Sequence, residues 1–150
     1  MYNIQIKGDK NFIIRTENAL NFIKEHSLYH YKLVIKYIGI IQQVKRNSGM
    51  WAEKIPPIFK VGEETSNSDI EWYAGSIVHD AYHSKLYNDY KKKYKYKDVP
   101  DNIWIGEKPE IKCQNIQYRF FLKSGASKER LKYTKDIINS KWWENDKVNW

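Results

Sequence analysis

The chain has 150 residues, a formal net charge of +8 and an aromatic content of 15%. This length suits a single hydrophobic core, and the aromatic content excludes a disordered chain. One cysteine, Cys113, excludes an internal disulfide, and no apolar run is long enough for a membrane span. We therefore expect one domain over residues 1–150 with no signal peptide. It is either a cytoplasmic protein or a piece of a larger, secreted or effector protein.

The N-terminal half combines alternating strands with amphipathic helices. Ser27 is a suitable N-cap for the longer of two helices, and Thr16 for the shorter one. Pro56 and Pro57 place the following strand near a sheet edge, because proline cannot donate a ladder hydrogen bond. The expected elements are a hairpin of residues 2–6 and 12–15, helices over residues 17–25 and 28–47, and a strand over residues 58–61.

Residues 68–90 predict a buried helix that carries a metal-binding face. Ser68 and Glu71 form a capping box at its start. His79 and His83 are four residues apart, so both imidazoles lie on one helix face, where they can share a metal ion. Asp80 follows the first histidine, at the position where an H-E-x-x-H metalloprotease carries its general base. This helix therefore holds the main candidate site of the chain.

A second helix is expected over residues 109–123, with a proline in its first turn and Gly125 as its stop. Its first turn contains Glu110, followed by Cys113 and Gln117 in the pattern E-x-x-C-x-x-x-Q. With the H-D-x-x-H sequence of residues 79–83, this pattern resembles the zincin-like, gluzincin-type zinc metallopeptidases. In that family a downstream glutamate completes the zinc site within an E-x-x-A-x-x-x-Q helix. A final helix is expected from a cap at Ser127 to about residue 139.

The resemblance implies an α+β fold, a mostly helical minimal zincin-like domain with a small N-terminal or edge β-sheet packed on the active-site helix. It implies Zn²⁺ bound by His79, His83 and Glu110, with Asp80 as general base in peptide-bond hydrolysis. The substrate would be a peptide or protein, paired by backbone hydrogen bonds with the strand of residues 58–61. Asp80 departs from the family's glutamate by one methylene, about 1.5 Å of reach. Proton transfer then requires a water relay or a shifted metal; otherwise the domain keeps a metal without hydrolysing anything.

The same residues also allow alternative interpretations of the function. Cys113 reads as a small buried hydrophobe rather than a ligand. His79-Asp80 also resembles the H-D doublet of HD-type metal-dependent phosphohydrolases. That family needs an upstream histidine, here His26 or His30, and a downstream aspartate, here Asp98 or Asp136. A third alternative is a non-catalytic basic binding module for nucleic acid or an acidic protein. That module would use Lys91, Lys92, Lys93, Lys95 and Lys97.

Overall fold

The computed structural model describes residues 1–95 and 97–140, and it has the expected α+β fold. The elements in chain order are β1 (Gln5–Lys7), α1 (Lys10–His26), α2 (Leu28–Tyr37), β2 (Ile40–Val44), β3 (Gly49–Trp51), β4 (Ile58–Gly62), α3 (Glu63–Ser66), α4 (Ile70–Lys93), α5 (Asp101–Trp104), α6 (Glu107–Ser124) and α7 (Lys128–Ser140). None of the described helices combines the length and the apolar character needed to cross a membrane.

The four strands form one mixed sheet in the order β1-β2-β4-β3. β1, β2 and β4 are parallel, and β3 runs antiparallel to β4. The strand predicted over residues 58–61 is therefore confirmed, but its predicted position near an edge is wrong. Pro56 and Pro57 precede β4, so every backbone N–H within the strand is available to the ladder. The edge next to β4 is formed by the short strand β3.

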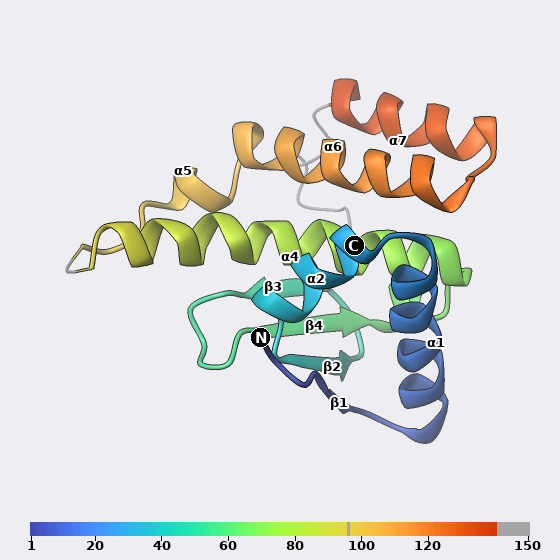
Figure 1. Cartoon of the computed structure of the whole chain (residues 1–150), viewed down its shortest axis with the longest axis horizontal. Coiled ribbons are helices and arrows are strands. Elements are labelled where there is room, and N and C mark those ends of the chain that lie inside the picture. The colour runs from blue at the N-terminus through green and yellow to red at the C-terminus, as the bar shows by residue number, and fades with distance from the viewer. Residues whose placement is uncertain (96, 141–150) are drawn as a thin grey trace.

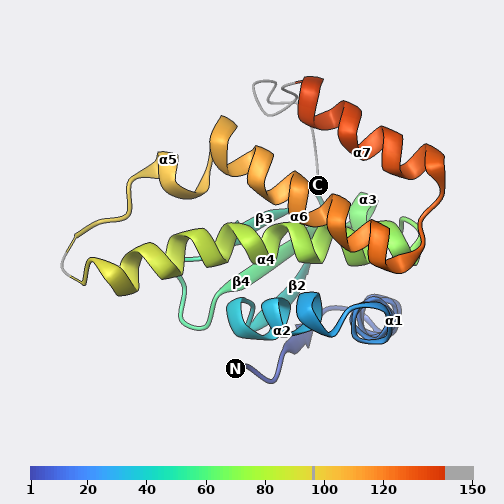
Figure 2. The same cartoon turned by 45° about the horizontal axis from the view of Figure 1, so that its top comes forward.

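Helix α4 organises the molecule. It lies between the sheet and the α6–α7 pair (Figure 1), and α1 and α2 lie on the opposite side of α4 from α6 and α7 (Figure 2). Residues 73–81 are all buried, because neighbours cover this part of the helix on every side. The helix begins one residue later than predicted, since Asp69 rather than Ser68 accepts the capping hydrogen bond from the Trp72 backbone N–H.

The N-terminal hairpin prediction is wrong. β1 pairs with β2, and residues 12–15 belong to α1, which begins at Lys10 rather than near residue 17. Asp9 caps this helix by accepting a hydrogen bond from the Phe12 backbone N–H at 2.8 Å. The buried residues of α1 follow helical spacing, which dominates over the short alternation in the sequence. They are Phe12, Thr16, Ala19 and Ile23.

The predicted start of the helix after Ser27 is confirmed, but its predicted end is wrong. The Ser27 hydroxyl caps α2, but the helix stops at Tyr37 and residues 40–44 form β2. Ile40 and Ile41 fit a helical period as well as a buried strand. They pair with β1 on one side and β4 on the other, and this sheet context selects the strand.

The last two helices agree with the sequence prediction. Gly125 ends α6 with φ of 73°, in the left-handed region that glycine adopts without steric cost. Ser127 then accepts a hydrogen bond from the Arg130 backbone N–H at the start of α7. The Arg130 guanidinium bonds to Asp69 and Glu71 and so fixes α7 to the first turn of α4.

Candidate metal centre

The three predicted ligands converge between α4 and α6. The Nε2 atoms of His79 and His83 are 3.2 Å apart. A Glu110 carboxylate oxygen lies 3.3 Å from Nε2 of His79, and the other lies 2.8 Å from Nε2 of His83. The helical spacing of four places the histidines on one face of α4, and the packing of α6 brings Glu110 to the same point.

The opposite nitrogen of each imidazole has its own hydrogen-bond partner. Nδ1 of His83 lies 2.5 Å from the backbone carbonyl oxygen of Trp104, at the end of α5. Nδ1 of His79 lies 3.1 Å from Oε1 of Gln117, two turns after Glu110 on α6. Both partners are acceptors, so both Nδ1 atoms donate and a neutral ring presents a lone pair at Nε2. This is the orientation that outer hydrogen bonds impose on metal-binding histidines.

Two imidazole lone pairs that face each other repel unless a cation lies between them. A tetrahedral zinc ion with Zn–N distances of about 2.0–2.1 Å separates its ligand atoms by about 3.3 Å. The two Nε2 atoms are 3.2 Å apart, close to such an edge, and each of them has one of the two Glu110 carboxylate oxygens within 3.3 Å. The donor set of two imidazoles and a carboxylate also matches zinc chemistry.

In the metal-free protein, a proton supplies the positive charge between the facing groups of the centre. Burial opposes charge on His83, but the neighbouring Cys113 and Glu110 raise its pKa well above the usual value. Burial likewise acts to raise the pKa of Glu110, but the neighbouring His79 and His83 outweigh it, so this pKa lies below its usual range. The metal-free centre therefore pairs an ionised glutamate with a protonated histidine. Metal binding has to displace that proton.

Asp80 lies beside the centre, as the sequence predicts. Its side chain is only 6% exposed, and its Oδ2 atom is buried without a hydrogen-bond partner. Burial raises the pKa of Asp80 to about 6, against the opposing charges of His79 and His83. This oxygen lies next to two candidate metal ligands. It is therefore available to bind a water molecule or to exchange a proton.

Cys113 is the residue of the centre that the sequence argument assigned differently. Its sulfur and one ring nitrogen of each of His79 and His83 lie within 4.8 Å of one another. Cys113 is fully buried, as expected of a small hydrophobe, but its thiol faces the histidines. The signal that could have identified it is the spacing of three from Glu110, which places both side chains on one face of α6.

The residues required by the phosphohydrolase alternative do not gather at this centre. His26 is exposed and its Nδ1 lies 2.8 Å from the Phe22 carbonyl oxygen, while His30 is buried against Ser27. Within residues 1–95 and 97–140, the cluster that could hold a metal comprises His79, His83 and Cys113. Neither Asp98 nor Asp136 belongs to it.

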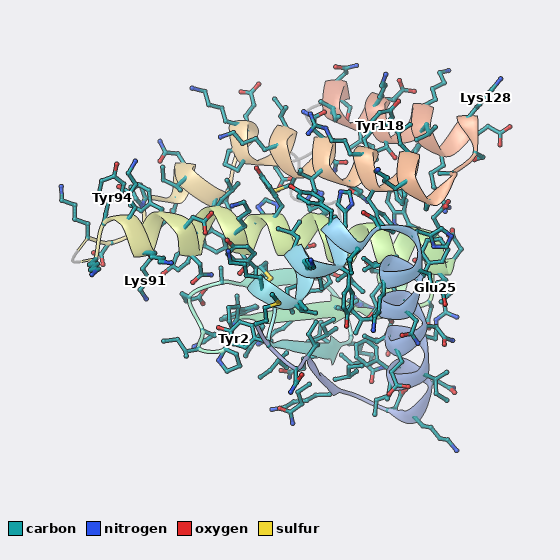
Figure 3. The ribbon with its side chains drawn as sticks, viewed as in Figure 1. Tyr2, Glu25, Lys91, Tyr94, Tyr118 and Lys128 are labelled. Carbon is teal, nitrogen blue, oxygen red and sulfur yellow. The ribbon has the colours of Figure 1, made fainter. Side chains whose placement is uncertain are left out.

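The described residues of the basic segment, 91–95 and 97, are exposed at the C-terminal end of α4 and just after it. The helix extends beyond the sheet, and Lys91 and Tyr94 lie at this end (Figure 3). The lysines that would bind a polyanion in the third alternative are all exposed, namely Lys91, Lys92, Lys93, Lys95 and Lys97. A nucleic-acid or acidic-protein interface at this segment remains a prediction.

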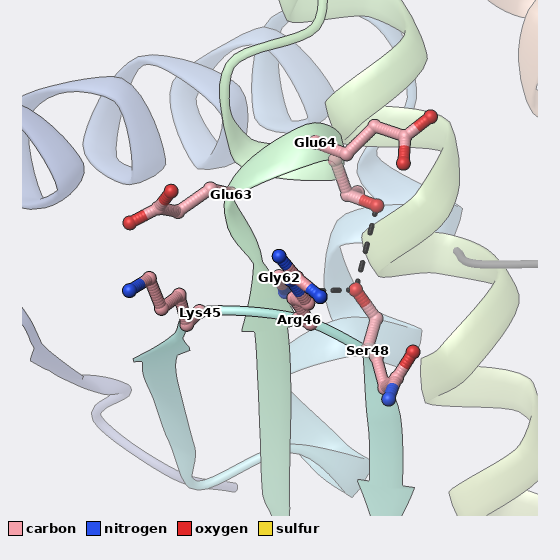
Figure 4. A pocket seen from close by; sticks show the side chains of 8 residues that line it. Lys45, Arg46, Ser48, Gly62, Glu63 and Glu64 are labelled. Carbon is pink, nitrogen blue, oxygen red and sulfur yellow. Dashed lines mark hydrogen bonds between the residues drawn. The ribbon is translucent and has the colours of Figure 1, made fainter.

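A cavity of about 410 Å³ lies elsewhere, at the ends of β2 and β4. Figure 4 shows Lys45 and Glu63 on one side of it, and the Ser48 hydroxyl bonded to the Gly62 backbone N–H and to Thr65. Basic and acidic side chains line it together, and all of its charged ones are exposed. It therefore shows no preference for an anion or a cation.

Comparison with known proteins returned no match. No family model matches the sequence, no curated protein matches it, and no solved structure matches the fold. The functional argument therefore depends on the residues of the centre and their geometry.

Proposed function

We propose that this protein is a zinc-dependent, metallopeptidase-like hydrolase that binds Zn²⁺ through His79, His83 and Glu110. The observation that carries the proposal is the approach of two Nε2 atoms to 3.2 Å while both Nδ1 atoms donate elsewhere. Core histidines that serve packing alone have no reason to turn their lone pairs toward each other and toward a carboxylate. Ligands of a shared ion, in contrast, must direct their lone pairs at the same point.

The chemistry of a bound zinc ion is suited to hydrolysis, because it lowers the pKa of a coordinated water and polarises a carbonyl oxygen. Asp80 supports this role by its place on α4, one residue after His79. Its buried carboxylate oxygen has no other partner, so it is free to accept a proton. Trp104 and Gln117 hold the two imidazoles in the tautomer that leaves each Nε2 open for the metal.

Metal analysis of the purified full chain tests the binding part of the proposal. We expect one zinc ion per chain in the parent protein and loss of zinc in His79→Ala and Glu110→Ala. His26→Ala is a matched control, because this exposed histidine bonds to its own helix and should leave the zinc content unchanged. A parent protein that binds no metal in the presence of excess zinc would refute the proposal. Zinc retained in Glu110→Ala would show that Glu110 is not a required ligand.

Hydrolysis is tested with a peptide library, with and without a chelator. We expect cleavage by the zinc-loaded parent, none after chelation, and a strong loss of rate in Asp80→Asn at unchanged zinc content. Asn is close in size to Asp but cannot take up the proton at neutral pH. A variant that cleaves as fast as the parent would exclude Asp80 as the general base.

A further inference from the structure

We propose that Cys113 is a fourth protein ligand of the same ion, beside His79, His83 and Glu110. This inference rests on the proposed zinc site and specifies its composition. Cys113 would occupy the position that a catalytic zinc site leaves open for water, so hydrolysis would require the ion to expand to five ligands or to exchange Cys113 for water.

The position of Cys113 on α6 supports this assignment. Residues three apart on a helix share one face, so Glu110 and Cys113 both face α4 and its two histidines. A tetrahedral zinc ion with Zn–S of about 2.3 Å and Zn–N of about 2.0–2.1 Å separates sulfur from nitrogen by about 3.6 Å. The sulfur and the ring nitrogens lie within 4.8 Å of one another, so a small adjustment of the side chain brings them to that separation.

An unsatisfied acceptor at the centre also favours coordination to a cation. Oε2 of Glu110 is buried and makes no hydrogen bond, although it lies 3.3 Å from Nε2 of His79. A buried carboxylate oxygen without a partner is costly, and coordination to a metal ion would satisfy it. Oε2 of Glu110 is therefore available as a ligand of an ion bound beside His79.

The charges of the four side chains also balance. Cysteine binds zinc as the thiolate and releases its proton to solvent. The thiolate of Cys113 and the carboxylate of Glu110 then neutralise the two charges of Zn²⁺, and the histidines bind as neutral rings. A buried site without net charge avoids the large cost of an unpaired charge in the protein interior. Thiolate coordination further favours zinc over magnesium or calcium, which prefer oxygen ligands.

X-ray absorption at the zinc edge of the zinc-loaded full chain tests the assignment. We expect one sulfur neighbour at about 2.3 Å in the parent protein, besides nitrogen and oxygen neighbours at about 2.0–2.2 Å. In Cys113→Ala the sulfur neighbour should disappear and an additional oxygen from water should replace it. Cys113→Ser provides a second variant of nearly native size in case the alanine variant does not fold.

Two outcomes separate the failure of this inference from the failure of the proposed function. Zinc bound in the parent with only nitrogen and oxygen neighbours would overturn the role of Cys113 and leave the three-ligand site intact. No zinc bound by the parent would refute the site itself, and the inference with it. A sulfur neighbour that persists in both Cys113 variants would also overturn the assignment.

Discussion

Two buried histidine sites both lie against α6, and their surroundings give them opposite properties. His30 on α2 is 3% exposed, its Nδ1 lies 2.6 Å from the Ser27 hydroxyl, and its Nε2 has no hydrogen-bond partner. Burial, with Lys123 and Arg119 nearby, lowers its pKa to about 4. At the centre between α4 and α6, Cys113 and Glu110 outweigh burial and raise the pKa of His83 well above its usual value.

The comparison shows that burial alone does not make a histidine a ligand. His30 is a neutral core residue that packs edge-on against the Phe120 ring, and its backbone N–H donates to the Ser27 hydroxyl that caps α2. The His79–His83 pair differs because anionic donors converge on it and because acceptors hold both Nδ1 atoms. The following predictions test this difference, from the largest expected effect to the smallest.

Removal of zinc should have the largest effect on stability. This effect should depend on the α4–α6 centre and not on His30. A ligand present at a thousand times its Kd stabilises the folded state by about 4 kcal/mol. We therefore expect a chelator to lower the thermal midpoint of the parent and of His30→Gln by similar amounts. His79→Ala should not respond to the chelator. A His30→Gln variant that no longer responds would show that the two sites are not independent.

Acid should destabilise the protein through His30, and this effect should be absent in His30→Gln. The pKa of His30 is about 4 in the folded state against 6.5 in the unfolded chain, so unfolding takes up a proton between these values. The contribution of the neutral ring is fully present above pH 6.5 and is lost as the pH falls toward 4. The expected loss relative to His30→Gln is about 3 kcal/mol, since one pKa unit corresponds to about 1.4 kcal/mol.

Urea unfolding of chelator-treated protein across this pH range measures the difference. Both proteins retain His79, His83, Asp80 and Glu110, so the titration of the α4–α6 centre cancels in the comparison. Equal pH dependence of the free energy of unfolding in the two proteins would contradict a neutral, buried His30.

Loss of the Gln117 side chain should weaken zinc binding without removing it. Gln117→Leu preserves the buried volume but takes away the acceptor that orients His79. Loss of such an outer partner typically costs 10–100-fold in metal affinity, about 1.4–2.7 kcal/mol. Competition with a metal-binding dye measures this change.

Gln114→Leu is the matched control for that experiment. Gln114 lies on the same helix and is fully buried, but neither atom of its amide makes a hydrogen bond. Its replacement should leave zinc affinity unchanged and should not destabilise the fold, because an apolar side chain removes an unsatisfied buried group. An equal loss of affinity in both variants would indicate a general packing effect and not orientation of His79.

Local sequence signals predicted much of the helical structure and most of the candidate centre. Capping residues and glycine stops identified the start of α2, the end of α6 and the start of α7, because these interactions involve residues close in sequence. The spacing of His79 and His83 defined a shared helix face for the same reason. The pattern around Glu110 identified the third candidate ligand before its position in space was known.

The errors occurred where two elements compete for the same residues. Residues 40–44 fit a helix or a strand, and only pairing with β1 and β4 selects the strand. Residues 12–15 alternate like a strand, but the Asp9 cap and the core contacts of α1 make them helical. The edge position predicted for β4 failed because strand order depends on contacts between distant segments.

The sequence by itself determined the composition of the helix faces, namely two histidines and an aspartate on α4, and a glutamate, a cysteine and a glutamine on α6. Only the tertiary structure decided that these faces meet. The packing of α6 on α4 brings Glu110 within 3.3 Å of both histidines and turns the Cys113 thiol toward them, and α5 supplies the Trp104 carbonyl to His83. The physical reason is the range of the interactions. Helical period and capping act over a few residues, whereas the hydrogen bonds that orient the two histidines of the candidate metal centre join groups 21 and 38 positions apart.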